Sequence, residues 1–201
     1  MNLYSGTTRL HKRILVALVA ILMLAATMST GDAAPSTTLP PEVATGGQDD
    51  FDWEIGAWRT KARVLAEPLS DTEDEWLQFR GASLVRPLAH RQANVVDLDV
   101  SGPAGRLQAL NLRLYEPQAG RWSSTFVSIG DGLLTPSVYG GFHDGVGEFY
   151  GQDQLGGRPI EVRFLIFRQG PDRARFEQAF SDDGGATWET NWIAIDRRIS
   201  S

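Results

Sequence analysis

The sequence predicts an all-β fold: a single antiparallel up-and-down barrel of about 8–10 strands, preceded by an N-terminal signal segment. From Phe51 onward, aromatic and β-branched residues alternate with polar ones in short runs, as in strands with one buried face. Gly, Pro, Asn and Asp separate the runs, where tight turns need them. No run shows an apolar stripe of helical period over three turns, so we expect at most one short helical turn, at Asp49–Glu54.

The N-terminus has the pattern of an export signal. A basic stretch, Arg9–Arg13, precedes the unbroken apolar run Ile14–Ala26. This run is shorter than the roughly 20 residues that span a bilayer, and small residues precede a cleavage point after Ala33. We therefore expect residues 1–33 to be a cleavable signal peptide and the domain to be exported, to the periplasm or the extracellular space. An uncleaved membrane anchor is the alternative.

The remainder divides into a tether and one domain. Residues 34–50 are rich in Pro, Thr and Gly, which predicts a flexible linker. Residues 51–199, about 150 in number, suffice for one core. Closing the sheet into a barrel is favoured because closure removes exposed edges. The expected strands are Ala57–Leu65, Glu75–Val85, Arg91–Val100, Leu107–Tyr115, Trp122–Ile129, Ser137–Phe142, Gly147–Gln152, Ile160–Phe167, Arg173–Phe180 and Glu189–Arg197.

Charge and cysteine content exclude several classes of partner and site. The formal net charge of -6 argues against a nucleic-acid backbone, or an anionic membrane once the signal is removed, as the main partner. The chain has no cysteine, which excludes disulfides, thiolate metal sites and a cysteine nucleophile. No cofactor motif or metal-ligand spacing is present, so we expect neither a cofactor nor a metal. No pattern specifies an oligomeric state.

The segment Ser181–Trp188 matches the Asp-box pattern at every defined position. In such a turn, Ser181 and Asp183 accept hydrogen bonds from backbone N–H groups and the two following glycines take positive φ. Trp188 is expected to pack across the hairpin base. Sialidase propellers carry several such boxes, whereas this chain has one and is too short for a propeller. The predicted role is structural.

Gly56 and Trp58, at the start of the domain, resemble the G-x-W signature of lipocalins and their calycin relatives. The resemblance implies that Trp58 plugs one end of the barrel. It also implies that a cation from the last strand, Arg197 or Arg198, crosses the ring face, a contact worth about 0.5–2 kcal/mol.

The order of motifs resembles a bacterial family of calycin-like barrels defined as a domain of unknown function. The motifs are, in order, Phe51–Trp58, Leu114–Trp122, Gly140–Gly145 and the Asp-box with Asn191-Trp192. The resemblance covers nearly the whole of 51–198. It departs at Glu116, where Asp usually precedes the Pro, and in the second and third strands. It implies a fold and no activity.

The function expected first is non-enzymatic binding of a small, mainly apolar molecule inside the barrel. Aromatic walls with a few polar groups suit such a pocket. A void of about 300 Å³ or more would meet the usual size of a ligand site, but a barrel of this width can also be filled by side chains. The candidate ligand-binding residues are Trp58, Arg80, Phe126, Tyr150, Phe176 and Gln178.

Two alternatives remain open. One is a hydrolase or isomerase that uses His143 as a general base with Asp144 or Glu148. The usual hydrolase and metalloprotease motifs are missing from the sequence, so no residue is assigned as catalytic or as a metal ligand. The other alternative is a cell-envelope interaction module that works through an outer face and has a packed interior.

Overall fold

The computed structural model describes residues 47–199, so the expected signal peptide and most of the expected linker lie outside the described residues. Within this range the chain folds as an antiparallel sheet in which consecutive strands pair, except that a two-residue strand at 133–134 pairs only with the strand before it. The first strand pairs with the last, which closes the sheet into a barrel. Among these residues no helix is long and apolar enough to cross a bilayer.

All ten expected runs form strands, and a two-residue strand at 133–134 is added. Two 3-10 helices, η1 (Asp52–Glu54) and η2 (Ala89–Arg91), complete the described elements. The strands are β1 (Gly56–Leu65), β2 (Trp76–Leu88), β3 (Ala93–Gly102), β4 (Gly105–Glu116), β5 (Arg121–Ser128), β6 (Leu133–Leu134), β7 (Val138–His143), β8 (Val146–Leu155), β9 (Arg158–Arg168), β10 (Arg173–Ser181) and β11 (Glu189–Arg198).

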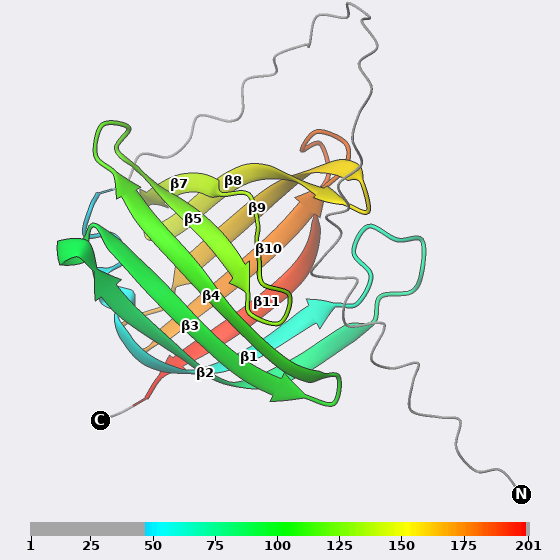
Figure 1. The fold of residues 1–201 in the computed structure, drawn as a ribbon, viewed down its shortest axis with the longest axis horizontal. Coiled ribbons are helices and arrows are strands. Elements are labelled where there is room, and N and C mark those ends of the chain that lie inside the picture. The colour runs from blue at the N-terminus through cyan, green and yellow to red at the C-terminus, as the bar shows by residue number, and fades with distance from the viewer. Residues whose placement is uncertain (1–46, 200–201) are drawn as a thin grey trace, which may run out of the picture.

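The fold is the predicted lipocalin-like up-and-down barrel. Figure 1 shows the green strands β3–β5 facing the orange and red strands β9–β11 across a common interior. β4 pairs with β5, β5 with β7, and β11 with both β10 and β1, so the ladder is continuous around the barrel. Successive side chains on a strand point to opposite faces, which gives the barrel an inside and an outside.

Burial follows the expected period of two. On β1 the residues Trp58, Thr60, Ala62 and Val64 are buried and alternate with the exposed residues Arg59, Lys61 and Arg63; Leu65, at the end of the strand, is buried as well. The inward residues form two apolar clusters, and the ring of Phe176 packs against both of them. One cluster includes Phe51, Trp122, Val138, Phe149, Val162 and Phe164. The other includes Ala62, Val64, Phe79, Val100, Leu107 and Trp192.

Phe51 and Trp122 of the first cluster close one end of the barrel, which we call the plugged end. Phe51 is 1% exposed and meets Trp122 edge to face, with the ring centroids 5.0 Å apart. Trp122 Nε1 donates a hydrogen bond to the Gly47 carbonyl, 3.0 Å away. The turn Gly47–Asp50, at the end of the expected linker, therefore packs against the barrel. The polar composition of this segment gives no sign of this contact.

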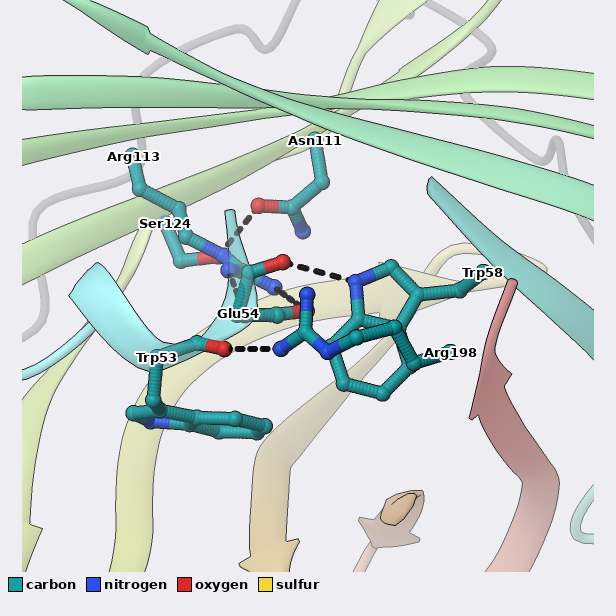
Figure 2. A network of polar contacts seen from close by, with 7 residues as sticks. All are labelled: Trp53, Glu54, Trp58, Asn111, Arg113, Ser124 and Arg198. Atoms are coloured by element: carbon teal, nitrogen blue, oxygen red, sulfur yellow. Dashed lines mark hydrogen bonds and ion pairs between the residues drawn. The ribbon is translucent and has the colours of Figure 1, made fainter. Parts of the chain in front are cut away.

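Trp58 and Arg198 complete the plug, as Figure 2 shows. Trp58 Nε1 donates to the Glu54 carbonyl at 2.7 Å, and the Arg198 guanidinium lies 4.1 Å from the centroid of the Trp58 ring. Arg198 also donates to the carbonyls of Trp53 and Ile55, at 2.5 and 3.0 Å. Of the two arginines considered from the sequence, Arg198 supplies the cation.

The turn between β10 and β11 is held by its own side chains. Ser181 Oγ accepts from the Gly185 N–H at 2.9 Å, and Asp183 Oδ1 accepts from the Thr187 N–H at 2.9 Å. Hydrogen bonds from the Thr187 hydroxyl and N–H, and from Ser181, lower the pKa of Asp183 to about 2. The Trp188 ring lies on the outer face, against Tyr150 and under the Arg163 guanidinium. These contacts give the turn a structural role.

Candidate functional site

Two cavities lie inside the barrel. The inner cavity, of about 90 Å³, is lined at one side by Glu54 and Arg113 and so lies toward the plugged end. The outer cavity, of about 80 Å³, is lined by Pro68, Pro136 and Leu155 and lies toward the opposite end. Four side chains line both cavities and form the partition between them: Phe126, Phe164, Gln178 and Trp192.

The wall of the inner cavity is mostly apolar. Besides the partition, it contains Phe176 and a set of small or aliphatic residues. The rings pack edge to face, with centroid distances of 6.0 Å between Phe126 and Trp192 and 5.2 Å between Phe164 and Phe176. Three residues with short side chains also line this cavity and leave space beside the rings: Ala62, Ala109 and Ala194.

A carboxylate stands at the polar end of the inner cavity. Asp196 Oδ1 accepts a hydrogen bond from the Thr60 hydroxyl at 2.5 Å, and the Thr60 and Ser83 hydroxyls are 3.1 Å apart. Burial is the main cause that raises the pKa of Asp196 to about 6; the nearby charge of Glu54 adds to it, and Thr60 and Arg113 oppose it. This carboxyl group therefore changes charge just below neutral pH.

The charges of Glu54 and Arg113 act on this carboxylate from nearby. These two residues form a buried ion pair, which Figure 2 shows. Arg113 is 4% exposed, and both terminal nitrogens of its guanidinium donate to the Glu54 carboxylate. Asn111 Oδ1 accepts from the Ser124 hydroxyl at 2.9 Å. Because Arg113 and Glu54 neutralise each other, the polar end keeps one negative charge whenever Asp196 is ionised.

The outer cavity has its own carboxyl group. Asp153 lines it from β8, and burial raises the pKa of that group. Gln178, in the partition, donates to Asn191 Oδ1 at 2.8 Å. Each cavity thus offers one acid that is not paired with a cation of the described residues, Asp196 in the inner and Asp153 in the outer cavity, and Gln178 lines both.

The structure places three of the six predicted binding residues on the cavity walls. Phe126 and Gln178 line both cavities, and Phe176 lines the inner one. Trp58 faces inward but belongs to the plug, where it is 1% exposed. Binding by these residues remains a prediction.

Arg80 and Tyr150 lie on the outer face of the barrel, which corrects their expected positions. On β2 the buried residue next to Arg80 is Phe79, and on β8 the buried residue next to Tyr150 is Phe149. With a period of two, Arg80 and Tyr150 must then point outward. Tyr150 packs against Trp188 there.

Asp196, Arg113 and Trp192 were not among the predicted binding residues. Trp192, Ala194 and Asp196 alternate along β11, so the sequence does put Asp196 on the same face as the inward residues. Charged residues near strand ends usually face solvent, however, and for that reason this pattern does not by itself predict an inward carboxylate.

His143 has no pocket around it. It lies at the β7–β8 turn with a side chain that is 81% exposed, and its Nε2 is 3.4 Å from Asp144 Oδ2. Glu148 points outward on β8, between the buried residues Gly147 and Phe149. Within residues 47–199, no three His, Asp or Glu side chains cluster closely enough to hold a metal ion.

Comparison with known proteins supports the fold. No family model matches the chain, and no curated protein matches it. Among solved structures, the S-type phycobiliprotein lyase CPES from Guillardia theta matches 77% of this chain and 93% of its own, with a TM-score of 0.52 and 11% identity. At this identity the likeness shows a shared barrel fold.

Two further solved barrels match with lower scores. EF1p2_mFAP2b bound to DFHBI matches 76% of this chain and 98% of its own, with 9% identity and a TM-score of 0.41. A de novo designed fluorescence-activating β barrel matches 75% and 98%, with 12% identity and a TM-score of 0.41.

Proposed function

We propose that this chain is an exported, non-enzymatic barrel that binds a small molecule with a largely apolar body in its interior. The observation that carries the proposal is the pair of cavities separated by four side chains: Phe126, Phe164, Gln178 and Trp192. A concave, mainly apolar space with a few polar groups is the usual form of a small-molecule site.

The volumes bound the size of the ligand. Neither cavity reaches the roughly 300 Å³ of a typical ligand site, and neither is filled by protein. A ligand of a few heavy atoms fits one cavity as it stands. A longer one spans both cavities after a rotation of partition side chains such as Phe126 or Trp192. The interior therefore favours a small or slender ligand over a bulky pigment.

Export is part of the same proposal. The pattern of Arg9–Arg13, Ile14–Ala26 and the small residues before Ala34 supports a signal peptide with cleavage after Ala33. The order of motifs supports membership in the calycin-like domain family. The barrel would then bind its ligand outside the cytoplasm.

Binding can be tested with ligand-observed NMR on a panel of small apolar molecules. Phe126→Trp adds volume at the partition, and Ala109→Leu fills the inner cavity alone. We expect at least one panel member to bind, and each variant to weaken that binding tenfold or more. Leu84→Trp is the matched control, because Leu84 is 39% exposed on the outer face of β2.

Equal weakening by all three variants would place binding on the surface, against the proposal. A panel without any binder, tested on protein shown to be folded by circular dichroism, would also count against it.

A further inference from the structure

The inner cavity has an apolar side and a charged side, and its charge is unbalanced. The Glu54–Arg113 pair is neutral within itself. Asp196 adds a second carboxylate, which accepts a hydrogen bond from the Thr60 hydroxyl and has no cation paired with it within residues 47–199. A charge held in the interior without an opposite charge is costly, and such groups are found where a ligand or a reaction requires them.

The second oxygen of Asp196 is available to a ligand. Oδ2 accepts no hydrogen bond from any residue in 47–199. It is also not one of the fully buried polar atoms without a partner in that range, so a ligand can reach it. Asp196 lines the inner cavity. Gln178 lines it as well, and its amide nitrogen is already used by Asn191, which leaves the Gln178 carbonyl oxygen as a second acceptor.

The neighbouring cations form ion pairs with carboxylates other than Asp196. Arg113 is paired with Glu54, and its guanidinium stacks on the Phe51 ring at 4.2 Å. Arg198 follows Asp196 on the same face of β11, but its charge is paired with Asp172, whose Oδ1 lies 3.4 Å from Arg198 Nε. Its guanidinium also donates to the carbonyls of Trp53 and Ile55 and covers the Trp58 ring. The polar end thus presents free acceptors and a net negative charge.

Resting on the proposed function, we propose that the inner cavity takes a small organic amine. Its ammonium group pairs with Asp196 Oδ2 at the polar end of the cavity. Its apolar body lies against the rings of Phe126, Phe176 and Trp192. An ammonium donates up to three hydrogen bonds and is attracted to aromatic faces, so both sides of the cavity suit it.

Other ligand classes fit less well. A carboxylate ligand would be repelled by ionised Asp196, because like charges in a poorly solvated space repel strongly. A metal ion would find a single carboxylate there that is not already paired with a cation, and the part of the chain that the structure describes holds no cluster of three metal ligands. A neutral alcohol can donate to Asp196 but leaves its charge unbalanced.

The test compares matched probes by isothermal titration calorimetry at pH 7.5. The probes are n-butylamine and benzylamine, their neutral counterparts n-butanol and benzyl alcohol, and the acids butyrate and benzoate. We expect an amine to bind at least tenfold more tightly than its alcohol and the acids not to bind. Asp196→Asn should abolish the preference for the amine. Asp153→Asn, in the outer cavity, is the matched control and should preserve it.

The pH dependence gives a readout that needs no variant. Amine affinity should fall up to tenfold for each pH unit below about 6, because Asp196 takes up a proton there while the amine stays charged. Glu54, Arg113 and Arg198 are the other charged groups at this end; Arg113 pairs with Glu54, and Arg198 lies 3.4 Å from Asp172.

The outcomes separate the two proposals. If alcohols bind as well as amines and Asp196→Asn changes neither, the amine inference fails and interior binding stands. If Asp153→Asn rather than Asp196→Asn removes the preference, the inferred site is wrong. A flat amine affinity between pH 5 and 7.5 also overturns the inference. Absence of binding by every probe counts against both proposals.

Discussion

Asp196→Asn should stabilise the ligand-free protein near neutral pH, by an amount that depends on pH in a defined way. The substitution keeps the shape of the side chain and an acceptor for the Thr60 hydroxyl, which Asp196 uses at 2.5 Å. It removes a charge that burial disfavours, since burial raises the pKa of Asp196 from 3.8 to about 6. A binding site that carries such a charge is expected to cost stability.

The magnitude follows from this pKa. Below pH 3.8, Asp196 is protonated in both the folded and the unfolded state, so its charge costs nothing. As the pH rises from 3.8 to about 6, the unfolded state ionises first, and wild-type stability falls. Each tenfold difference in proton affinity is worth about 1.4 kcal/mol, which gives roughly 3 kcal/mol once the pH passes 6. Asn at this position does not titrate, so the variant keeps that stability.

Urea denaturation between pH 3 and 8 measures the effect as the difference between variant and wild type. Burial also raises the pKa of Asp50 and Asp153, and hydrogen bonds lower that of Asp183, but these groups are common to both proteins and cancel. Asp144→Asn is the control, because it removes a carboxylate whose side chain is 89% exposed and so carries no cost of burial.

The expected result is a stability difference that grows by roughly 3 kcal/mol between pH 3 and 7.5 and then levels off. A difference that stays constant over this range, or that shrinks as the pH rises, would refute the account of Asp196 as a buried, unpaired carboxylate.

Two further predictions concern the plugged end. Gly56→Ala should lower the free energy of unfolding by about 1–3 kcal/mol in urea denaturation, because the φ of Gly56 is +129° and an added Cβ would lie 2.9 Å from Arg198 Nη1. Gly130→Ala is the control and should be neutral, because no atom of the described residues lies within 4 Å of an added Cβ there. Equal losses of stability in the two variants would contradict this reasoning. Arg113→Met should cost about 3–5 kcal/mol by leaving Glu54 charged and unpaired, and adding Glu54→Gln should recover part of that loss; additive losses in the double variant would show that the pair is not coupled.

The strands and the plug could be predicted from the sequence because their signals are local. Period-two alternation and turn residues located all ten barrel strands, and the Gly56 and Trp58 motif located the plug. Arg198 could be anticipated because closing a meander brings the end of the last strand beside the start of the first, where Trp58 pairs with Arg198.

The cavity walls could be predicted only in part. Phe126, Phe176 and Gln178 share the inward phase of their strands, which the sequence shows. Arg80 and Tyr150 are neighbours of inward residues, and an error of one position reverses the face. Asp196 could not be assigned to a site, because its role depends on Thr60 across the β1–β11 pair and on the distant Glu54 and Arg113.

Interior binding is tested most directly by methyl NMR of the protein titrated with n-butylamine. The account predicts shifts at the inner cavity, for Ala62, Val96 and Ala194, and at the indole of Trp192. Shifts confined to outward methyls such as Leu84 of β2 would contradict it, because the ligand would then lie on the outside of the barrel.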